Sequence, residues 1–162
     1  MKILIVYASK YGCTKDCVLY LKNALHGDVM VCSVQEKISN LEQFDTVLIG
    51  SSIYMNAIQK GIKEFCNKNL KILMNKRIGL FIGCYTPADT KDYINTFFPE
   101  ELLSHAACKS IFGGEMRYDT MNVLYRKLFQ WLQKLEGFQK GFKEPHIDYA
   151  EIQRFARVME KI

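Results

Sequence analysis

The chain has 162 residues, 49% of them hydrophobic, and a formal net charge of +5 at pH 7. This length predicts one domain over residues 1–162, and the apolar run at 3–8 is too short for a signal peptide or a membrane span. We therefore expect a cytoplasmic protein. The mildly basic charge contains no long run of lysine or arginine, so it permits an anionic partner such as a membrane surface and predicts no nucleic-acid partner.

Apolar runs typical of buried strands alternate with helical patterns along the chain. Helices are predicted over 14–25, 58–67 and 91–98, with a last one from a capping box at Asp148 to about Lys161. Such alternation indicates a parallel sheet covered on both faces, which binds ligands beyond the carboxyl ends of its strands. The predicted strands are 3–8, 29–34, 46–50, 78–83 and 106–112.

The turn after the first strand, Ser9-Lys10-Tyr11-Gly12-Cys13-Thr14, is typical of a phosphate site. Backbone N–H groups and hydroxyls converge in such a turn, and the following helix adds partial positive charge at its N-terminus. The chain lacks both G-x-G-x-x-G and G-x-x-x-x-G-K-[ST], which argues against a dinucleotide fingerprint and a P-loop NTPase. The turns after the third, fourth and fifth strands would complete a pocket with aromatic walls.

The six cysteines and three histidines predict no metal site. No two cysteines form a Cys-x-x-Cys pair, and no histidine lies at zinc-finger spacing from a cysteine. Reduced thiols in a cytosolic core are the expected state. No side chain stands out as a general acid or base, so no catalytic residue is assigned.

The turn at 9–14 resembles the flavodoxin phosphate loop, S/T-x-x-G-x-T, and the segments 49–54 and 83–86 resemble the two flavin-contacting loops of flavodoxins. The resemblance implies a three-layer, doubly wound α/β fold with a five-stranded parallel sheet in the order 2-1-3-4-5. It also implies FMN as the cofactor, with Tyr54 and Tyr85 beside the isoalloxazine. The cofactor-binding residues that it implies are Ser9, Lys10, Tyr11, Gly12, Cys13, Thr14, Ser51, Ser52, Ile53, Tyr54, Gly83, Cys84, Tyr85, Thr86 and Gly114.

A narrower similarity is to flavodoxin-like, menaquinone-dependent protoporphyrinogen oxidases. It rests on Gly50-Ser51-Ser52-Ile53, Arg117-Tyr118 and Phe155-Ala156-Arg157. This similarity implies an FMN-dependent oxidoreductase that oxidises a substrate such as protoporphyrinogen IX and passes the hydrogen equivalents to a quinone, in heme biosynthesis. Two alternatives stay open, namely a flavodoxin electron carrier between redox partner proteins and a cofactor-free docking module.

Two features differ from electron-carrier flavodoxins. The segment 51–57 lacks the glycine that many carriers place opposite flavin N5, which predicts weaker stabilisation of the one-electron-reduced flavin. The net charge is basic, whereas carriers are typically acidic. The charge favours an enzyme, or a carrier with a different partner, over an ordinary flavodoxin, and the glycine-free segment also favours an enzyme.

An amphipathic helix is predicted within an insertion over about 115–147, between the cap Asp119 and the terminator Gly137. The segment 120–135 is basic and contains no acidic residue. Its apolar face could bind the inner face of a membrane, cover the flavin, form a subunit interface or pack on its own domain. That face consists of Met121, Leu124, Tyr125, Leu128, Trp131, Leu132 and Leu135.

Overall fold

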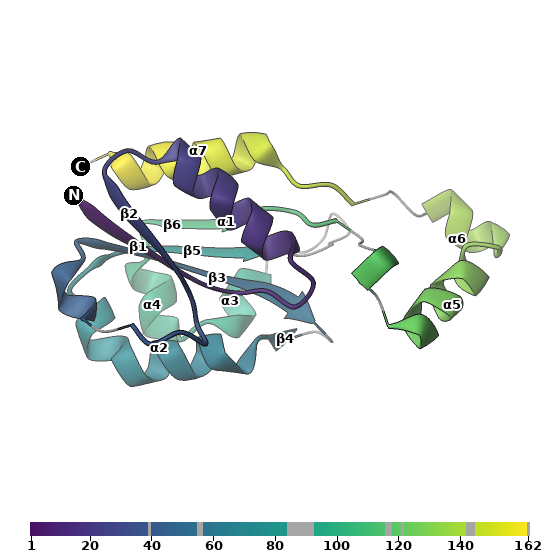
Figure 1. Ribbon diagram of the computed structural model, residues 1–162, viewed down its shortest axis with the longest axis horizontal. Helices are drawn as coiled ribbons and strands as arrows, with labels where there is room; N and C mark the ends of the chain where they lie inside the picture. Colours follow the sequence, from purple (N-terminus) through teal and green to yellow (C-terminus); the bar gives the residue numbers. More distant parts are fainter. Residues whose placement is uncertain are drawn as a thin grey trace.

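Five parallel strands form the centre of the computed structural model, which describes residues 1–38, 40–54, 57–83, 93–115, 118–120, 122–141 and 145–161 (Figure 1). Their hydrogen-bonded order is β2-β1-β3-β5-β6, so the predicted order 2-1-3-4-5 is confirmed. The short strand β4 (Ala57–Ile58), which was not predicted, pairs antiparallel with the end of β3. The parallel strands are β1 (Lys2–Ala8), β2 (Asp28–Ser33), β3 (Thr46–Tyr54), β5 (Arg77–Gly83) and β6 (Cys108–Ile111).

Helices cover both faces of the sheet. One layer contains α1 (Cys13–Ala24) and α7 (Tyr149–Glu160), and the other contains α2 (Lys60–Leu73), α3 (Tyr93–Phe97) and α4 (Glu100–His105). Between β2 and β3, the described residues contain one 3-10 turn, η1 (Leu41–Gln43), and no α-helix. The fold class predicted from the sequence is therefore confirmed.

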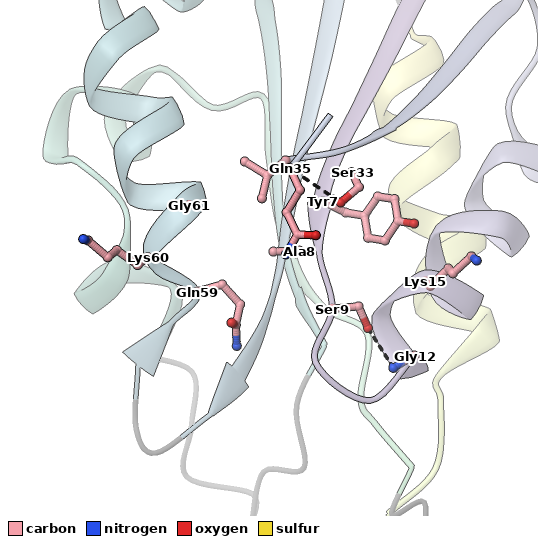
Figure 2. A pocket seen from close by; sticks show the side chains of 11 residues that line it. Tyr7, Ala8, Ser9, Gly12, Lys15, Ser33, Gln35, Gln59, Lys60 and Gly61 are labelled. Carbon is pink, nitrogen blue, oxygen red and sulfur yellow. Dashed lines mark hydrogen bonds between the residues drawn. The ribbon is translucent and has the colours of Figure 1, made fainter. Parts of the chain in front are cut away.

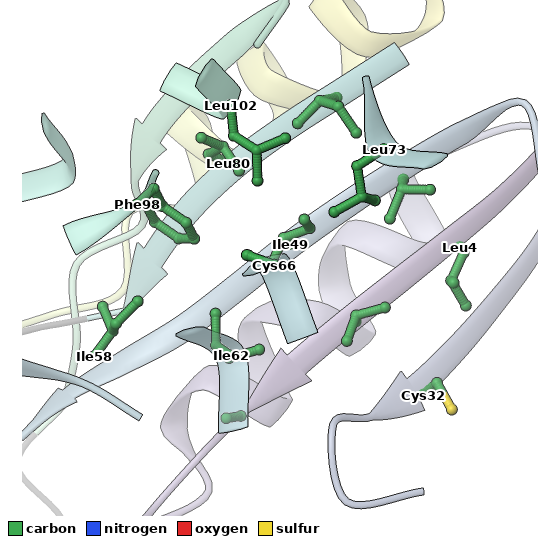
Figure 3. Close-up of a cluster of buried hydrophobic side chains, with 14 of the residues drawn as sticks. Leu4, Cys32, Ile49, Ile58, Ile62, Cys66, Leu73, Leu80, Phe98 and Leu102 are labelled. Carbon is green, nitrogen blue, oxygen red and sulfur yellow. The ribbon is translucent and has the colours of Figure 1, made fainter. Parts of the chain in front are cut away.

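The core lies in two clusters, one on each face of the sheet. Residues of β1 alternate between them, because successive side chains of a strand point to opposite faces. Ile3 and Ile5 pack with α1 and α7, whereas Leu4 and Val6 pack with α2 to α4, and all four are fully buried. Figure 3 shows the second cluster, in which Ile62 and Cys66 of α2 lie over the strands.

The described part of the insertion after β6 contains two helices, α5 (Val123–Leu132) and α6 (Glu136–Gly141), so the prediction of one helix between Asp119 and Gly137 was wrong. The cap of α5 is Asn122, whose Oδ1 accepts a hydrogen bond from Leu124 N at 3.1 Å, whereas Asp119 lies in a preceding 3-10 turn, η3 (Tyr118–Thr120). Gly137 lies inside α6 rather than ending the helix. The ring of Phe138 packs edge-on against Phe129, with centroids 5.6 Å apart, and this contact folds α6 back on α5.

Other boundaries differ by a few residues. The helix predicted at 91–98 is α3, with 91–92 outside the described residues, and the separate helix α4 begins after Pro99. Strand β3 continues to Tyr54 and helix α2 to Leu73, beyond the predicted ends. None of the described helices has the length and hydropathy needed to cross a bilayer.

Candidate functional site

The turn between β1 and α1 has the geometry of an anion-binding loop. Gly12 precedes the first residue of α1 in the left-handed conformation, with φ of 87°, which a glycine adopts without a Cβ penalty. The hydroxyl of Ser9 accepts a hydrogen bond from Gly12 N at 3.0 Å, so the turn closes on itself. Thr14, in the first turn of the helix, is 1% exposed. The N-terminus of α1 has no side-chain cap from its N-cap residue, and its partial positive charge lies at the carboxyl edge of the sheet.

The end of β3 lies directly beside this turn. Strand register pairs Ser51 with Ala8, the last residue of β1. Ser51 is fully buried, and its hydroxyl accepts from Gln59 N and donates to Ser52 O, each at 3.0 Å. The side-chain amide of Gln59 also donates to Ser52 Oγ at 3.3 Å. Ser51 therefore connects the start of α2 to the sheet, a structural role that its sequence motif did not reveal.

The end of β5 also contacts the turn. Gly83 pairs with Ser52 in the sheet, and a Cβ atom built on Gly83 would lie 2.8 Å from Thr14 Oγ1. The remaining predicted residues of this loop, Cys84, Tyr85 and Thr86, lie outside the described residues. The structure thus places Gly83 against the candidate phosphate loop.

The loop after β6 reaches the same place. Its backbone turns at Gly113, with φ of 70°, and Gly114 is buried. Glu115 N donates a hydrogen bond to Cys13 Sγ at 3.2 Å, which links the start of the insertion to the candidate phosphate loop. The turn at 9–14, the ends of β3 and β5 and the start of the loop after β6 therefore meet at one edge of the sheet, although they are far apart in the sequence.

Two predicted residues can be placed only in part. Ile53 is half-buried and pairs with Ile58 of β4, and the backbone of Tyr54 pairs with Ala57. The tip of this hairpin, Met55 and Asn56, lies outside the described residues, as do Arg117 and Met121. The proposed stacking of Tyr54 and Tyr85 on a flavin stays a prediction.

A pocket of about 310 Å³, with both polar and apolar lining, borders the candidate phosphate loop (Figure 2). It is lined by Ser9 and Gly12 of that loop, and also by residues outside the sequence motifs. Lys15 and Lys60 also line it, and the amine of Lys60 pairs with Glu64 at 3.3 Å. The additional polar residues come from the turn after β2 and the start of α2, namely Ser33, Gln35 and Gln59.

Tyr7 is the titratable ring at this pocket. Its partial burial, together with the nearby carboxylate of Glu36, raises the pKa of the Tyr7 phenol. The phenol therefore stays protonated at neutral pH and can donate a hydrogen bond. Among the described residues, no group of histidine, cysteine, aspartate and glutamate side chains could hold a metal ion.

This fold and site define a class of protein. It is a doubly wound α/β protein with an anion-binding type of loop between β1 and β3, where the strand order reverses. The chain belongs to the flavodoxin domain family, whose model matches residues 4–159. This match is to flavodoxin domains in general and supports no narrower group. A comparison with curated protein sequences finds no match.

Several solved flavodoxins have a similar structure. Oxidised flavodoxin 1 from Bacillus cereus is 15% identical over 99% of this chain and 98% of that one, with a TM-score of 0.60. A flavodoxin of Streptococcus pneumonia TIGR4 is 14% identical over 98% and 97% of the two chains, with a TM-score of 0.57. The flavodoxin of Fusobacterium nucleatum bound to flavin mononucleotide is 16% identical over 71% of each chain, with a TM-score of 0.51. At these identities the similarity establishes the fold.

Proposed function

We propose that this flavodoxin-domain protein binds FMN and transfers electrons through it. The observation that carries the proposal is the convergence of the loop at 9–14 with the ends of β3, β5 and β6 at one edge of the sheet. The FMN-bound flavodoxin of Fusobacterium nucleatum supports the choice of cofactor. When bound, FMN supplies one- and two-electron redox chemistry, and the protein binds and orients it.

The residues present fit a phosphate group at the loop. Gly12 has the left-handed backbone and the missing Cβ that allow close approach of a ligand, and α1 begins with its N-terminal dipole at that point. Ser9, Gly12 and Thr14, with the N–H groups of Lys10, Tyr11 and Cys13, would hold the phosphate. The flavin ring would lie toward the ends of β3 and β5.

The cofactor proposal is tested by titrating the apoprotein into FMN and following the flavin fluorescence. Binding should quench the fluorescence and shift the visible absorption bands. A colourless protein that leaves FMN fluorescence unchanged at micromolar concentration would contradict the proposal and would support the cofactor-free docking module instead.

The physiological role is proposed to be electron transfer between redox partners, as the flavodoxin family match favours. Oxidation of protoporphyrinogen IX with a quinone acceptor is the second candidate, because the chain is basic and resembles that enzyme group in short segments. The structure gives two of these segments a packing explanation. A Cβ atom on Gly50 would lie 2.1 Å from the Phe81 ring, and Phe155 and Ala156 are core residues of α7. These residues therefore do not discriminate between the two roles.

An anaerobic assay separates the two roles. The FMN-loaded protein is mixed with protoporphyrinogen IX and a menaquinone analogue, and porphyrin fluorescence is followed. Steady-state turnover supports the oxidase. Absence of turnover supports the electron carrier, as does nearly complete conversion of the flavin to its one-electron-reduced form in a redox titration. That conversion would also contradict the weak stabilisation of this form that the glycine-free segment 51–57 predicts.

A further inference from the structure

The helices α5 and α6 form a hairpin that extends beyond the carboxyl ends of the strands, away from the sheet (Figure 1). They meet each other through Phe129 and Phe138. The opposite side of α5 is an apolar surface, here called the α5 face, made of Leu124, Leu128, Trp131 and Leu135. These residues are spaced by four, three and four positions, which places them on one side of a helix and of the turn that follows it.

The α5 face is exposed in the folded chain. Leu124 is 74% exposed, Leu128 50%, Trp131 58% and Leu135 43%. Packing on its own domain, the ordinary explanation for an amphipathic helix, therefore does not account for these four side chains. Contiguous exposed apolar residues of this size mark a binding surface.

Basic side chains lie along one side of the α5 face. The described stretch 122–141 has four basic residues and one acidic residue, Glu136. Lys127 and Lys134 are exposed and lie about a quarter turn from the apolar side chains. An exposed tryptophan between leucines, flanked by lysines, suits the boundary between lipid headgroups and acyl chains.

We propose that the α5 face docks on an anionic lipid surface. A second copy of the chain fits the face less well, because an antiparallel twofold pairing of α5 would bring the lysines of both copies to the same side of the interface. An anionic bilayer accommodates the leucines and Trp131 in its interface and attracts the lysines, each worth about 1 kcal/mol near such a surface. The helix has only 10 residues, so it would lie along the surface rather than span it.

Docking of the hairpin would also determine where the candidate site lies relative to the lipid surface. The insertion starts at the hydrogen bond between Glu115 N and Cys13 Sγ in the candidate phosphate loop. A docked hairpin would therefore hold the carboxyl edge of the sheet near the lipid surface. Lipid-soluble redox partners such as quinones would reach the candidate site from there. The docking itself does not depend on cofactor binding.

Vesicle binding tests the proposal with the full chain. Trp131 is the single tryptophan, so its emission reports on the α5 face alone. With vesicles of equal parts phosphatidylcholine and phosphatidylglycerol at low salt, the emission should shift to the blue and the protein should co-sediment. The double variant Lys127→Glu/Lys134→Glu and the single variant Leu128→Ser should each weaken binding at least about tenfold.

Matched variants elsewhere separate the surface from general charge and hydrophobicity. Lys68→Glu/Lys71→Glu on α2 makes the same charge change, and Leu19→Ser on α1 removes a leucine that is 45% exposed. Both should bind as the unaltered chain does. The proposal would be overturned if vesicles caused no blue shift and no co-sedimentation, or if the control variants lost as much vesicle binding as the α5 variants. Dimers that form with rising protein concentration in the absence of lipid, and that Leu128→Ser blocks, would also overturn it. FMN titration of the same variants tests the cofactor proposal separately.

Discussion

Gly83 and Thr14 lie so close that a Cβ atom on Gly83 would be 2.8 Å from Thr14 Oγ1. Gly83 ends β5, and Thr14 is buried in the first turn of α1. The variant Gly83→Ala should therefore push the Thr14 hydroxyl out of position in the candidate phosphate loop. We expect FMN affinity to fall at least about tenfold, the effect of losing about 1.4 kcal/mol of binding energy.

The variant Gly79→Ala is the control for this prediction. Its Cβ atom would lie 2.7 Å from Phe155 and 2.8 Å from Leu48, in the core and away from the loop. Both variants should lower the free energy of unfolding by about 1–3 kcal/mol through overpacking. Only Gly83→Ala should weaken FMN binding when measured by fluorescence titration on the folded fraction. Equal affinities in the two variants would show that Gly83 does not act on the site.

Gly12 and Gly27 form a second matched pair, because both have positive φ angles, of 87° and 109°. Alanine at either position should destabilise the fold by about 1–2 kcal/mol, since the left-handed region disfavours a Cβ atom. Gly12→Ala should also lower FMN affinity at least about tenfold, whereas Gly27→Ala, beside Met1 O at the opposite end of α1, should leave it unchanged. Thermal unfolding and flavin titration measure the two effects. Unaltered FMN affinity in Gly12→Ala would argue against a phosphate at this loop.

The strands were predictable because the apolar runs are continuous and parallel sheets bury both faces, whereas their order followed from the resemblance to flavodoxins. Gly12 was also predictable, since a turn between a strand and a helix requires its backbone freedom. Helix α4 was missed because its 6 residues are too few to display a helical period, although Leu102 is fully buried in the core.

The sequence predicted which loops form the site, but it did not predict the contacts that their side chains make. The Ser51 hydroxyl looks from its motif like a ligand for the cofactor, yet it bonds to Gln59 N, which is eight residues away in the chain. The pocket beside the loop is lined in part by Gln35 and Lys60, which belong to no recognised motif and come together only through the tertiary fold. The division of the insertion into α5 and α6 likewise depends on an aromatic contact rather than on a local signal.

The thiols should differ strongly in reactivity. Cys66, on the side of α2 that faces the sheet, is fully buried, and burial raises the pKa of its thiol to about 12. Cys13, in the candidate phosphate loop, is only half-buried. With a thiol reagent at pH 8, Cys13 should be modified and Cys66 should stay unmodified until urea unfolds the chain. Peptide mass mapping measures both, and FMN should slow modification of Cys13. Modification of Cys66 at the rate of Cys13 in the folded chain would contradict the assigned burial.

The Glu151 carboxylate should stabilise the fold to an extent that depends on pH. Its carboxylate accepts a hydrogen bond from Arg154 Nε at 2.7 Å and another from the buried Ser110 hydroxyl, and these lower the pKa of Glu151 despite partial burial. Because the pKa in the folded state lies below that in the unfolded state, the stabilisation is complete above the unfolded pKa, near 4.5. It is lost as the pH falls through the lower folded pKa.

Urea unfolding of Glu151→Gln at several pH values tests this coupling between α7 and β6. At pH 7 the variant should be less stable by at most about 1 kcal/mol, because solvent screens a partly exposed pair. The difference should shrink as the pH approaches 3, where the unaltered carboxylate gains its proton. Glu64→Gln, which breaks the exposed Lys60–Glu64 pair at 3.3 Å, should show little change at any pH. A constant difference between Glu151→Gln and the unaltered chain across this range would mean that the Glu151 charge contributes nothing and that only its shape and hydrogen bond to Ser110 stabilise the fold.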